Sequence, residues 1–427
     1  MLDVLWGAGG MLVLLLIALA LSTDRRAIRP RTVAAALALQ IGFAVAVLYW
    51  PLGQRALEGA SRGVQAVIDA SGAGISFLFG PLLPAEGQGQ VVALQVLPVI
   101  IFFASLSAVL YHLGVLQRVV TVLGGGLGRL LDTERAESVN AAANIFVGQT
   151  EAPLLIKPYV RGLSRSGLFA VMVGGLSTVA GSVLVGYSLL GARLDYLIAA
   201  SFMAAPGALL MAKIVLPESR AADPDPGPDE ATPGAVDEGD RAEESGGAAE
   251  PDEVEQHRNV IDAAAAGAAE GLRLAATIGA MLLAFISLVA LVNVLLGGVG
   301  GWFGADDLSL EQVLGWVFSP LMSVIGVPWD EAVQAGGYVG QKIVVNEFVA
   351  FASFGPEAGT LSDKTSVIVT FALTGFANLG SLGILLGGLG GIAPERRPEI
   401  AALGLRAVLA ATLANLMSAA IAGVLIG

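Results

Sequence analysis

The sequence is poor in the residues that carry redox, metal and nucleophilic chemistry. It contains no cysteine and only two histidines, His112 and His257, among its 427 residues. The lack of cysteine excludes disulfides, thiolate metal sites and cysteine nucleophiles. With so little histidine, the sequence offers no evident Ser, His and Asp grouping and no evident cluster of metal ligands. We therefore expect a protein that is not an enzyme.

Charge is also scarce. Charged residues make up 14% of the chain and hydrophobic residues 55%, a balance far more apolar than that of soluble globular proteins. A stretch of about 20 apolar residues is long enough to cross a bilayer. Such stretches occur at residues 4–22, 32–50, 92–117, 167–192, 195–216, 268–297, 364–391 and 399–426. They predict an all-α polytopic membrane protein with eight transmembrane helices.

The net charge of −13 is concentrated in one segment. Residues 218–255 carry fourteen acidic residues against two arginines, a net charge of −12. The same segment is rich in proline and glycine, a composition that cannot bury enough apolar surface to fold. We interpret residues 217–258 as an acidic, disordered linker between two parts of the chain.

Positive charge at the ends of the apolar stretches predicts the orientation. Clusters of arginine and lysine mark the cytoplasmic side of a membrane protein. They occur at residues 25–31, 118–135, 157–165 and 396–406. These clusters predict that both termini lie outside and the acidic linker lies in the cytoplasm, provided that residues 134–160 enter the membrane and return to the same side. Polar residues at helical spacing over 55–69 predict an amphipathic helix on the membrane surface.

Four polar or glycine-rich motifs interrupt the apolar pattern, in two similar pairs. NIFVGQTEAP (144–153) precedes GGLSTVAGSVLVGY (174–187), and KIVVNEFVAF (342–351) precedes GFANLGSLGILLGG (375–388). Broken helix is tolerated at membrane depth only where it is buried in protein or lines a cavity. Each pair predicts a helical hairpin followed by a broken span, as in the inverted repeats of secondary transporters.

This pattern divides the chain into four predicted parts. Residues 1–117 form N-terminal scaffold spans with the interfacial helix, and the acidic linker separates two repeats. The first repeat, 118–216, contains a re-entrant hairpin at 134–160 and the broken span 167–192. The second repeat, 259–427, contains a hairpin at 329–355, the broken span 364–391 and the last span.

Each hairpin carries one carboxylate near its tip, Glu151 in the first and Glu347 in the second. A carboxylate at the bilayer centre costs about 2.5–3.5 kcal/mol on insertion scales, and such residues usually face a pathway or a partner. Ordinary solvated loops at the membrane surface would also contain glutamate. We favour the binding interpretation because Gln149, Thr150 and Asn346 accompany these carboxylates within apolar surroundings.

Three long motifs, GQTEAPLLIKP, GQKIVVNEFVAF and ALTGFANLGSLGI, together with the final NLMSAAIAG, resemble the signatures of the concentrative nucleoside transporter family. The resemblance covers nearly the whole chain except the acidic linker. It implies a homotrimer in the bacterial inner (plasma) membrane that takes up nucleosides of the uridine, cytidine and adenosine class. It also implies that a transport domain containing the hairpins moves to give alternating access. No nucleic acid partner is expected.

The resemblance also implies functional residues, carried over by motif position. The nucleobase would meet Gln149, Thr150, Glu151 and Val183, whereas the ribose would meet Glu347, Asn378 and Ser381, with Phe376 packing against the nucleoside. The coupling ion would be sodium, held by Asn144, Val147, Thr178 and Val179. Amide, hydroxyl and carbonyl oxygens are hard ligands that suit an alkali cation.

Three alternatives remain open at this point. A proton carried by Glu151 or Glu347 could replace sodium as the coupling ion. An intramembrane enzyme acting on nucleotides could use the two carboxylates, although the chain offers no accompanying nucleophile or metal site. A passive channel is a third alternative, disfavoured by two hairpins with matched tips.

Overall fold

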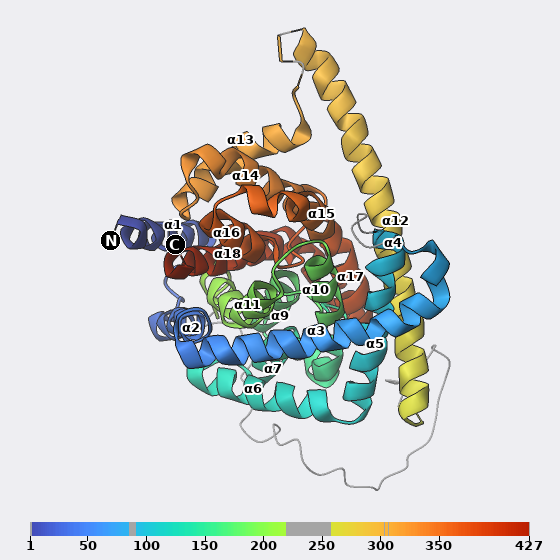
Figure 1. Cartoon of the computed structure of the whole chain (residues 1–427). Coiled ribbons are helices and arrows are strands. Elements are labelled where there is room, and N and C mark those ends of the chain that lie inside the picture. Colours follow the sequence, from blue (N-terminus) through green and yellow to red (C-terminus); the bar gives the residue numbers. More distant parts are fainter. Residues whose placement is uncertain (1, 85–90, 219–257, 303, 306, 427) are drawn as a thin grey trace, which may run out of the picture.

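The computed structural model describes residues 2–84, 91–218, 258–302, 304–305 and 307–426. Throughout these residues the chain forms helices, and they include no strand (Figure 1). Of the predicted acidic linker, only Pro217, Glu218 and Arg258 fall within the described residues. The all-α prediction is therefore confirmed for the described part of the chain.

Eight helical segments in the described residues are long and apolar enough to span a membrane. They are α1 (Leu2–Leu21), α2 (Pro30–Ala44) with η1 (Val45–Tyr49), α3 (Pro51–Phe79) with η2 (Gly80–Leu82), α4 (Val92–Gln95) with α5 (Leu97–His112), α9 (Arg165–Ser177) with α10 (Gly181–Leu189), α11 (Leu194–Val215), α12 (Val260–Gly301) and, after η5 (Pro394–Arg396), α18 (Arg397–Ile426). Seven of these segments coincide with predicted apolar spans.

Two segments differ from a simple count of spans. The predicted span 364–391 consists of two shorter helices, α16 (Asp363–Leu373) and α17 (Gly380–Ile392), separated by residues 374–379. Conversely, α3 passes the length and composition test for a span, although the sequence predicts a surface helix there. In Figure 1, α3 crosses one face of the helical bundle. Its location relative to a bilayer stays a prediction.

The helices follow the same order in two halves of the chain. The first half runs from α5 to α11 and contains α6 (Val115–Leu131), α7 (Arg135–Ala143), η3 (Ala152–Ile156), α8 (Lys157–Val160), α9 and α10. The second half runs from α12 to α18 and contains α13 (Leu310–Val324), α14 (Trp329–Val344), α15 (Glu347–Glu357), η4 (Ala358–Thr360), α16 and α17. The first hairpin differs from its prediction, because its returning arm is a 3-10 turn and one short helix. The second hairpin has two full helices joined at Val345 and Asn346.

The two halves also pack against each other in a matched way. Helix α9 contacts both α11 and α18, and α16 contacts both α18 and α11. As a result, α9 and α16, the two half-helices that precede the breaks, each pack against α11 and α18, the last helices of the two halves. The residues of α9 from Ser166 to Ser177 are all buried. The two breaks therefore lie inside protein rather than at its surface.

Helix α12 forms the edge of the molecule together with α5. Its 42 residues correspond to about 63 Å of helix, and it stands along one side of the bundle in Figure 1. A Cβ at Gly267 would lie 2.6 Å from Cβ of Ala108, and one at Gly271 would lie 2.7 Å from Cβ of Ala104. These glycines let the two backbones approach closely, as small residues do in membrane helix pairs.

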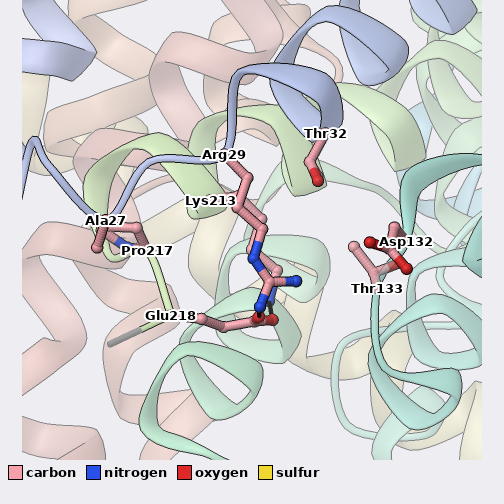
Figure 2. A pocket seen from close by; sticks show the side chains of 8 residues that line it. All are labelled: Ala27, Arg29, Thr32, Asp132, Thr133, Lys213, Pro217 and Glu218. Atoms are coloured by element: carbon pink, nitrogen blue, oxygen red, sulfur yellow. Dashed lines mark hydrogen bonds and ion pairs between the residues drawn. The ribbon is translucent and has the colours of Figure 1, made fainter. Parts of the chain in front are cut away.

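An ionic cluster joins the base of the first hairpin to the end of α11, and Figure 2 shows three of its members, Arg29, Lys213 and Glu218. Lys213 Nζ lies 2.8 Å from Glu137 Oε2 and 2.9 Å from Glu218 Oε1. Arg29, just before α2, contacts the other oxygen of Glu218 at 2.7 Å. Glu137 also accepts a hydrogen bond from the backbone of Glu134, which completes a capping box at the start of α7. The cluster therefore fixes α7 relative to α2 and α11.

Candidate functional site

The two helix breaks meet in the middle of the molecule. One break separates α9 from α10 at residues 178–180, and the other separates α16 from α17 at residues 374–379. The N–H of Phe376 donates a 3.1 Å hydrogen bond to the carbonyl of Thr178, which joins the breaks directly. Segments almost 200 residues apart in sequence thus form one site, built from non-helical backbone.

Both breaks begin with the same local device. The hydroxyl of Thr178 donates to the carbonyl of Gly174 at 2.9 Å, and that of Thr374 donates to the carbonyl of Thr370 at 2.7 Å. Each threonine is the first residue after its half-helix and bonds back four residues, a contact known to weaken and bend helices. The repeated threonine accounts for why both half-helices end at equivalent places.

The tip of the first hairpin packs against the end of α9. A Cβ at Gly175 would lie 2.9 Å from Cβ of Gln149, and one at Gly174 would lie 3.6 Å from Nδ2 of Asn144. Gln149 and Asn144 are both buried. The glycines of α9 therefore provide the room in which the polar tip sits.

The main chain of the same tip lies against the first break. The N–H of Gly181 donates to the carbonyl of Phe146 at 3.1 Å, and a Cβ at Gly148 would lie 3.6 Å from Cβ of Ala180. Val147 lies between Phe146 and Gly148 in the hairpin tip, and Val179 comes directly before Ala180 in the break. Both valines are buried. The structure thus brings together the four predicted ion ligands, Asn144, Val147, Thr178 and Val179, on two adjoining segments.

The donor set at this place fits an alkali cation. The Oδ1 atom of Asn144 is buried and has no hydrogen-bond partner among the described residues, and the same holds for Oε1 of Gln149. Buried acceptors of this kind usually have a partner, so an unpartnered one calls for an ion, a water or a ligand. Within the described ranges no group of three or more His, Cys, Asp and Glu side chains could hold a metal. Neutral oxygen ligands suit sodium better than a multivalent or soft ion.

The second hairpin presents a carboxylate that is held on both of its oxygens. Oε1 of Glu347 accepts from the hydroxyl of Tyr187 at 3.0 Å, and Oε2 accepts from Nδ2 of Asn378 at 2.8 Å. Oδ1 of Asn378 in turn accepts from the N–H of Ser381 at 2.8 Å. One network therefore connects the start of α15 with α10 and with the second break, and it unites the three predicted ribose-binding residues Glu347, Asn378 and Ser381.

The local sequence explains the position of Glu347. Asn346 caps α15, because its Oδ1 accepts from the N–H of Val349 at 2.8 Å. Glu347 is therefore the first residue of the helix, where the positive end of the helix dipole favours a negative charge. It is only 6% exposed, so the carboxylate faces protein or a ligand rather than bulk solvent.

The remaining predicted residues lie around this network. Val183 is buried on α10, one turn before Tyr187, and half-buried Phe376 lies in the second break. Thr150 reaches α17, where a Cβ at Gly388 would lie 3.0 Å from its methyl group. Glu151 is exposed, as Thr150 is, and its Oε2 accepts the N–H of Gly148 at 3.2 Å, which closes the turn of its own hairpin.

Three residues of the site were not predicted from the sequence: Tyr187, Lys342 and Asn415. Tyr187 is fully buried, stacked 4.4 Å from the ring of Phe351, and binds Glu347. Lys342 and Asn415 are buried and bonded to each other at 2.8 Å. Each is a polar residue within an apolar run, which is a functional signal in membrane proteins. That signal was available in the sequence, but it does not identify a partner.

Comparison with protein families gives three matches that cover most of the chain. Residues 196–423 match the Na+ dependent nucleoside transporter C-terminus, and residues 9–82 match the Na+ dependent nucleoside transporter N-terminus. Residues 93–194 match a nucleoside recognition domain named Gate. The C-terminal match alone spans more than half of the chain.

Full-length relatives and solved structures agree with these matches. The chain is 52% identical to an uncharacterized transporter of Bacillus subtilis, YutK, over 99% of this chain and 100% of that protein. It is 46% identical to the nucleoside permease NupC of Helicobacter pylori over 99% and 98% of the two chains.

Two solved structures of the transporter CNTnw cover nearly the whole chain. An inward-facing, substrate-bound structure is 51% identical, with a TM-score of 0.88 over 99% of this chain and 98% of that one. A variant of CNTnw in an outward-facing state is 50% identical, with a TM-score of 0.89 over 100% and 98%. On the strength of both the family matches and these relatives, the chain belongs to the concentrative, Na+-dependent nucleoside transporter family.

Proposed function

We propose that this protein is a secondary active symporter that takes up nucleosides, with a sodium gradient as the driving force. The observation that carries the proposal is the network of Glu347, Asn378 and Ser381 at the second break, which is bonded through Phe376 to the first break. A buried carboxylate with neighbouring amide and hydroxyl groups can accept and donate hydrogen bonds to a neutral polar ligand. The family of the chain supports a nucleoside as that ligand.

The two hairpins would bind opposite ends of the nucleoside. On the ribose side, ionised Glu347 would accept hydrogen bonds from the vicinal hydroxyls, and Asn378 and Ser381 would complete their coordination. On the base side, Gln149, Thr150 and Glu151 offer both donors and acceptors. Val183 and Phe376 would supply apolar contact. The buried, unpartnered Oε1 of Gln149 supports this assignment, because a base N–H would satisfy it.

Sodium would occupy the place between the first hairpin and the first break. The Oδ1 atom of Asn144, the hydroxyl of Thr178 and the carbonyls of Val147 and Val179 would hold it. Sodium supplies positive charge where the backbone leaves α9 and presents carbonyl oxygens. Binding of the ion would therefore stabilise the first break. Thr178 of this break is bonded to Phe376 of the substrate site, and this contact would couple ion binding to substrate binding.

Alternating access would follow from movement of a transport domain containing both hairpins and both broken spans. The likeness to CNTnw in inward-facing and outward-facing states supports this movement. We further propose a homotrimer in the bacterial inner membrane, a scaffold within residues 1–117 and repeats at 118–216 and 259–427. Both hairpins would be re-entrant and the repeats inverted. Both termini would lie outside and the acidic linker 217–258 in the cytoplasm.

Uptake of labelled uridine and adenosine into proteoliposomes tests the proposal. Accumulation against a gradient, driven by external sodium at constant pH, is the expected result. Accumulation driven by an imposed pH gradient without sodium would instead identify a proton-coupled symporter. Equilibration without accumulation would indicate a channel, and release of a modified product from a nucleotide would indicate an enzyme.

A further inference from the structure

The break after α16 leaves several backbone carbonyls without their helical donors, among them those of Ala372 and Thr374. In a continuous helix, the N–H of Phe376 would bond to the carbonyl of Ala372, and that of Asn378 to the carbonyl of Thr374. Phe376 instead donates to Thr178 at 3.1 Å. Asn378 instead donates to Phe376 at 2.8 Å. The carbonyls of Ala372 and Thr374 therefore need other partners.

The break after α9 leaves a similar carbonyl at Ser177. A continuous helix would satisfy it with the N–H of Gly181, but that group donates to Phe146 at 3.1 Å. The side chain of Asn415 in α18 takes over at both breaks, because its Nδ2 donates to the carbonyls of Ser177 at 2.7 Å and Thr374 at 2.8 Å. One neutral amide thus satisfies a carbonyl from each half of the chain.

The carbonyl of Ala372 is satisfied by a charged side chain. Lys342 Nζ, at the end of α14, donates to this carbonyl at 2.7 Å and to Oδ1 of Asn415 at 2.8 Å. Lys342 is only 1% exposed. A buried ammonium costs several kcal/mol of desolvation, roughly as much as the orphaned carbonyl that it satisfies. Hydrogen bonding alone does not explain it, because a neutral amide performs the same task next to it.

The charge itself has two targets. The C-terminal end of α16 carries partial negative charge on its free carbonyls, as any helix end does. Glu347, five residues after Lys342 in the same hairpin, is a buried carboxylate, and a buried positive charge favours the ionised form of a nearby carboxyl group. We therefore expect the positive charge of Lys342 to stabilise the end of the half-helix, which it contacts, and to favour the ionised form of the proposed ribose acceptor.

Among the described residues of the first half, no buried lysine lies at the equivalent place. There, the end of α9 and the first hairpin present the unpartnered Oδ1 of Asn144 and the residues proposed to hold sodium. We propose that Lys342 is a resident cation, that is, a positive charge built into the protein. It stabilises the break of the second half in the way that an exchangeable cation stabilises the break of the first half. It is a positioning residue: with Asn415 it holds the end of α16, and it keeps Glu347 ionised and directed at the substrate. This inference rests on the proposed function for the exchangeable ion and for Glu347 as an acceptor of the substrate.

Replacement of Lys342 by glutamine separates charge from hydrogen bonding, because glutamine keeps N–H donors at the site. Lys157→Gln in α8 of the first hairpin is the matched control. Uridine binding to the full-length purified variants is measured calorimetrically at a series of sodium concentrations, with choline as the replacement ion. Thermal unfolding of each variant is recorded in parallel.

We expect Lys342→Gln to bind uridine at least about tenfold more weakly than Lys157→Gln at low sodium. High sodium should restore part of this loss, and the Hill coefficient for sodium should rise above that of the wild type, because a second cation now enters. Equal uridine affinity in the two variants would overturn the proposal. A loss that is the same at every sodium concentration would also overturn it, since that result describes a hydrogen-bonding role alone.

Two further measurements keep the proposal testable. If Lys342→Gln does not fold, the net charge moved per uridine is measured for the wild type from the membrane potential at which uridine flux reverses. One charge is expected, and two charges would mean that the second half also holds an exchangeable cation. If wild-type binding is insensitive to sodium, the proposed sodium site fails. The analogy with an exchangeable cation then fails with it, and weaker uridine binding by Lys342→Gln than by Lys157→Gln would support only a positioning role at Glu347.

Discussion

The hydroxyl of Tyr187 donates a 3.0 Å hydrogen bond to Oε1 of Glu347, across 160 residues of sequence. Tyr187 is itself fixed by aromatic packing, with its ring 4.4 Å from that of Phe351 and 4.9 Å from that of Phe348. The carboxylate is therefore aimed by a rigid donor on α10. This relationship links the broken span of the first half to the hairpin of the second half.

The first prediction concerns this donor. Tyr187→Phe should weaken uridine binding by about tenfold, because the loss of a hydrogen bond to a buried charged group costs about 1.5 kcal/mol. Equilibrium binding of uridine measures this effect. Tyr338→Phe is the control, since the hydroxyl of Tyr338 binds Glu357 at the opposite end of the same hairpin. If both variants bind uridine equally well, Tyr187 does not position the carboxylate.

The second prediction concerns the ribose. Glu347→Gln should sharply reduce uridine uptake, because a neutral amide accepts hydrogen bonds more weakly than a carboxylate. Dideoxyuridine lacks the two ribose hydroxyls, so its uptake should fall much less between wild type and variant. Uptake of both labelled substrates gives the comparison, and Glu357→Gln in the same helix serves as the control. An equal loss for both substrates would contradict the assignment of Glu347 to the ribose.

The third prediction concerns the ion. Asn144→Leu removes the unpartnered Oδ1, so sodium stimulation of uridine uptake should vanish while the protein still inserts into the membrane. Uptake with and without external sodium at constant pH measures this effect. Asn293→Leu should instead retain sodium stimulation, because Asn293 bonds Glu311 and Leu310 away from the breaks. Undiminished stimulation in Asn144→Leu would remove Asn144 from the ion site.

The fourth prediction concerns the ionic cluster. Lys213→Met leaves Glu137 buried without its cation and should lower the free energy of unfolding by about 3–5 kcal/mol. The double variant Lys213→Met with Glu137→Gln should recover a large part of this loss. Arg193→Met, which breaks an exposed pair with Asp195, should cost no more than about 1 kcal/mol. Denaturation in detergent compares the three variants, and similar losses in all of them would argue against a special role for Lys213.

The fifth prediction concerns the second break. Gly375 has a φ of 154°, and a Cβ there would lie 2.4 Å from Oδ1 of Asn415 and 2.8 Å from the carbonyl of Ser177. Gly375→Ala should therefore displace Asn415 and abolish transport. Gly383→Ala in α17, where no atom lies within 4 Å of the new Cβ, should transport normally. Uptake by Gly375→Ala at the wild-type rate would mean that the contact with Asn415 is dispensable.

The sequence predicted the membrane helices and the breaks because both depend on local composition. A run of about 20 apolar residues needs no tertiary information to be recognised, and a polar or glycine-rich interruption within it is equally local. Thr178, Asn378 and Ser381 lie in motifs that interrupt apolar runs, but their roles were assigned through the resemblance to the transporter family. The returning arm of the first hairpin was less predictable, since Pro153 and Pro158 limit regular helix there.

The partners of the polar residues could not be predicted. Lys342 and Asn415 are 73 residues apart, and Asn415 reaches Ser177 across 238 residues. Such pairs depend on how whole helices pack, and a single sequence contains no record of that packing. Helix α3 illustrates the opposite difficulty, because its amphipathic pattern and its length point to different locations.

The double hydrogen bond of Asn415 has a thermodynamic consequence. Because one side chain holds the carbonyls of Ser177 and Thr374 together, the ends of α9 and α16 move as a single body. The binding site they frame then keeps one geometry, whichever side of the membrane it faces. A ligand with equal affinity for two states shifts neither of them. Nucleoside binding would therefore not favour either orientation, and the direction of net movement would be decided by the gradients alone.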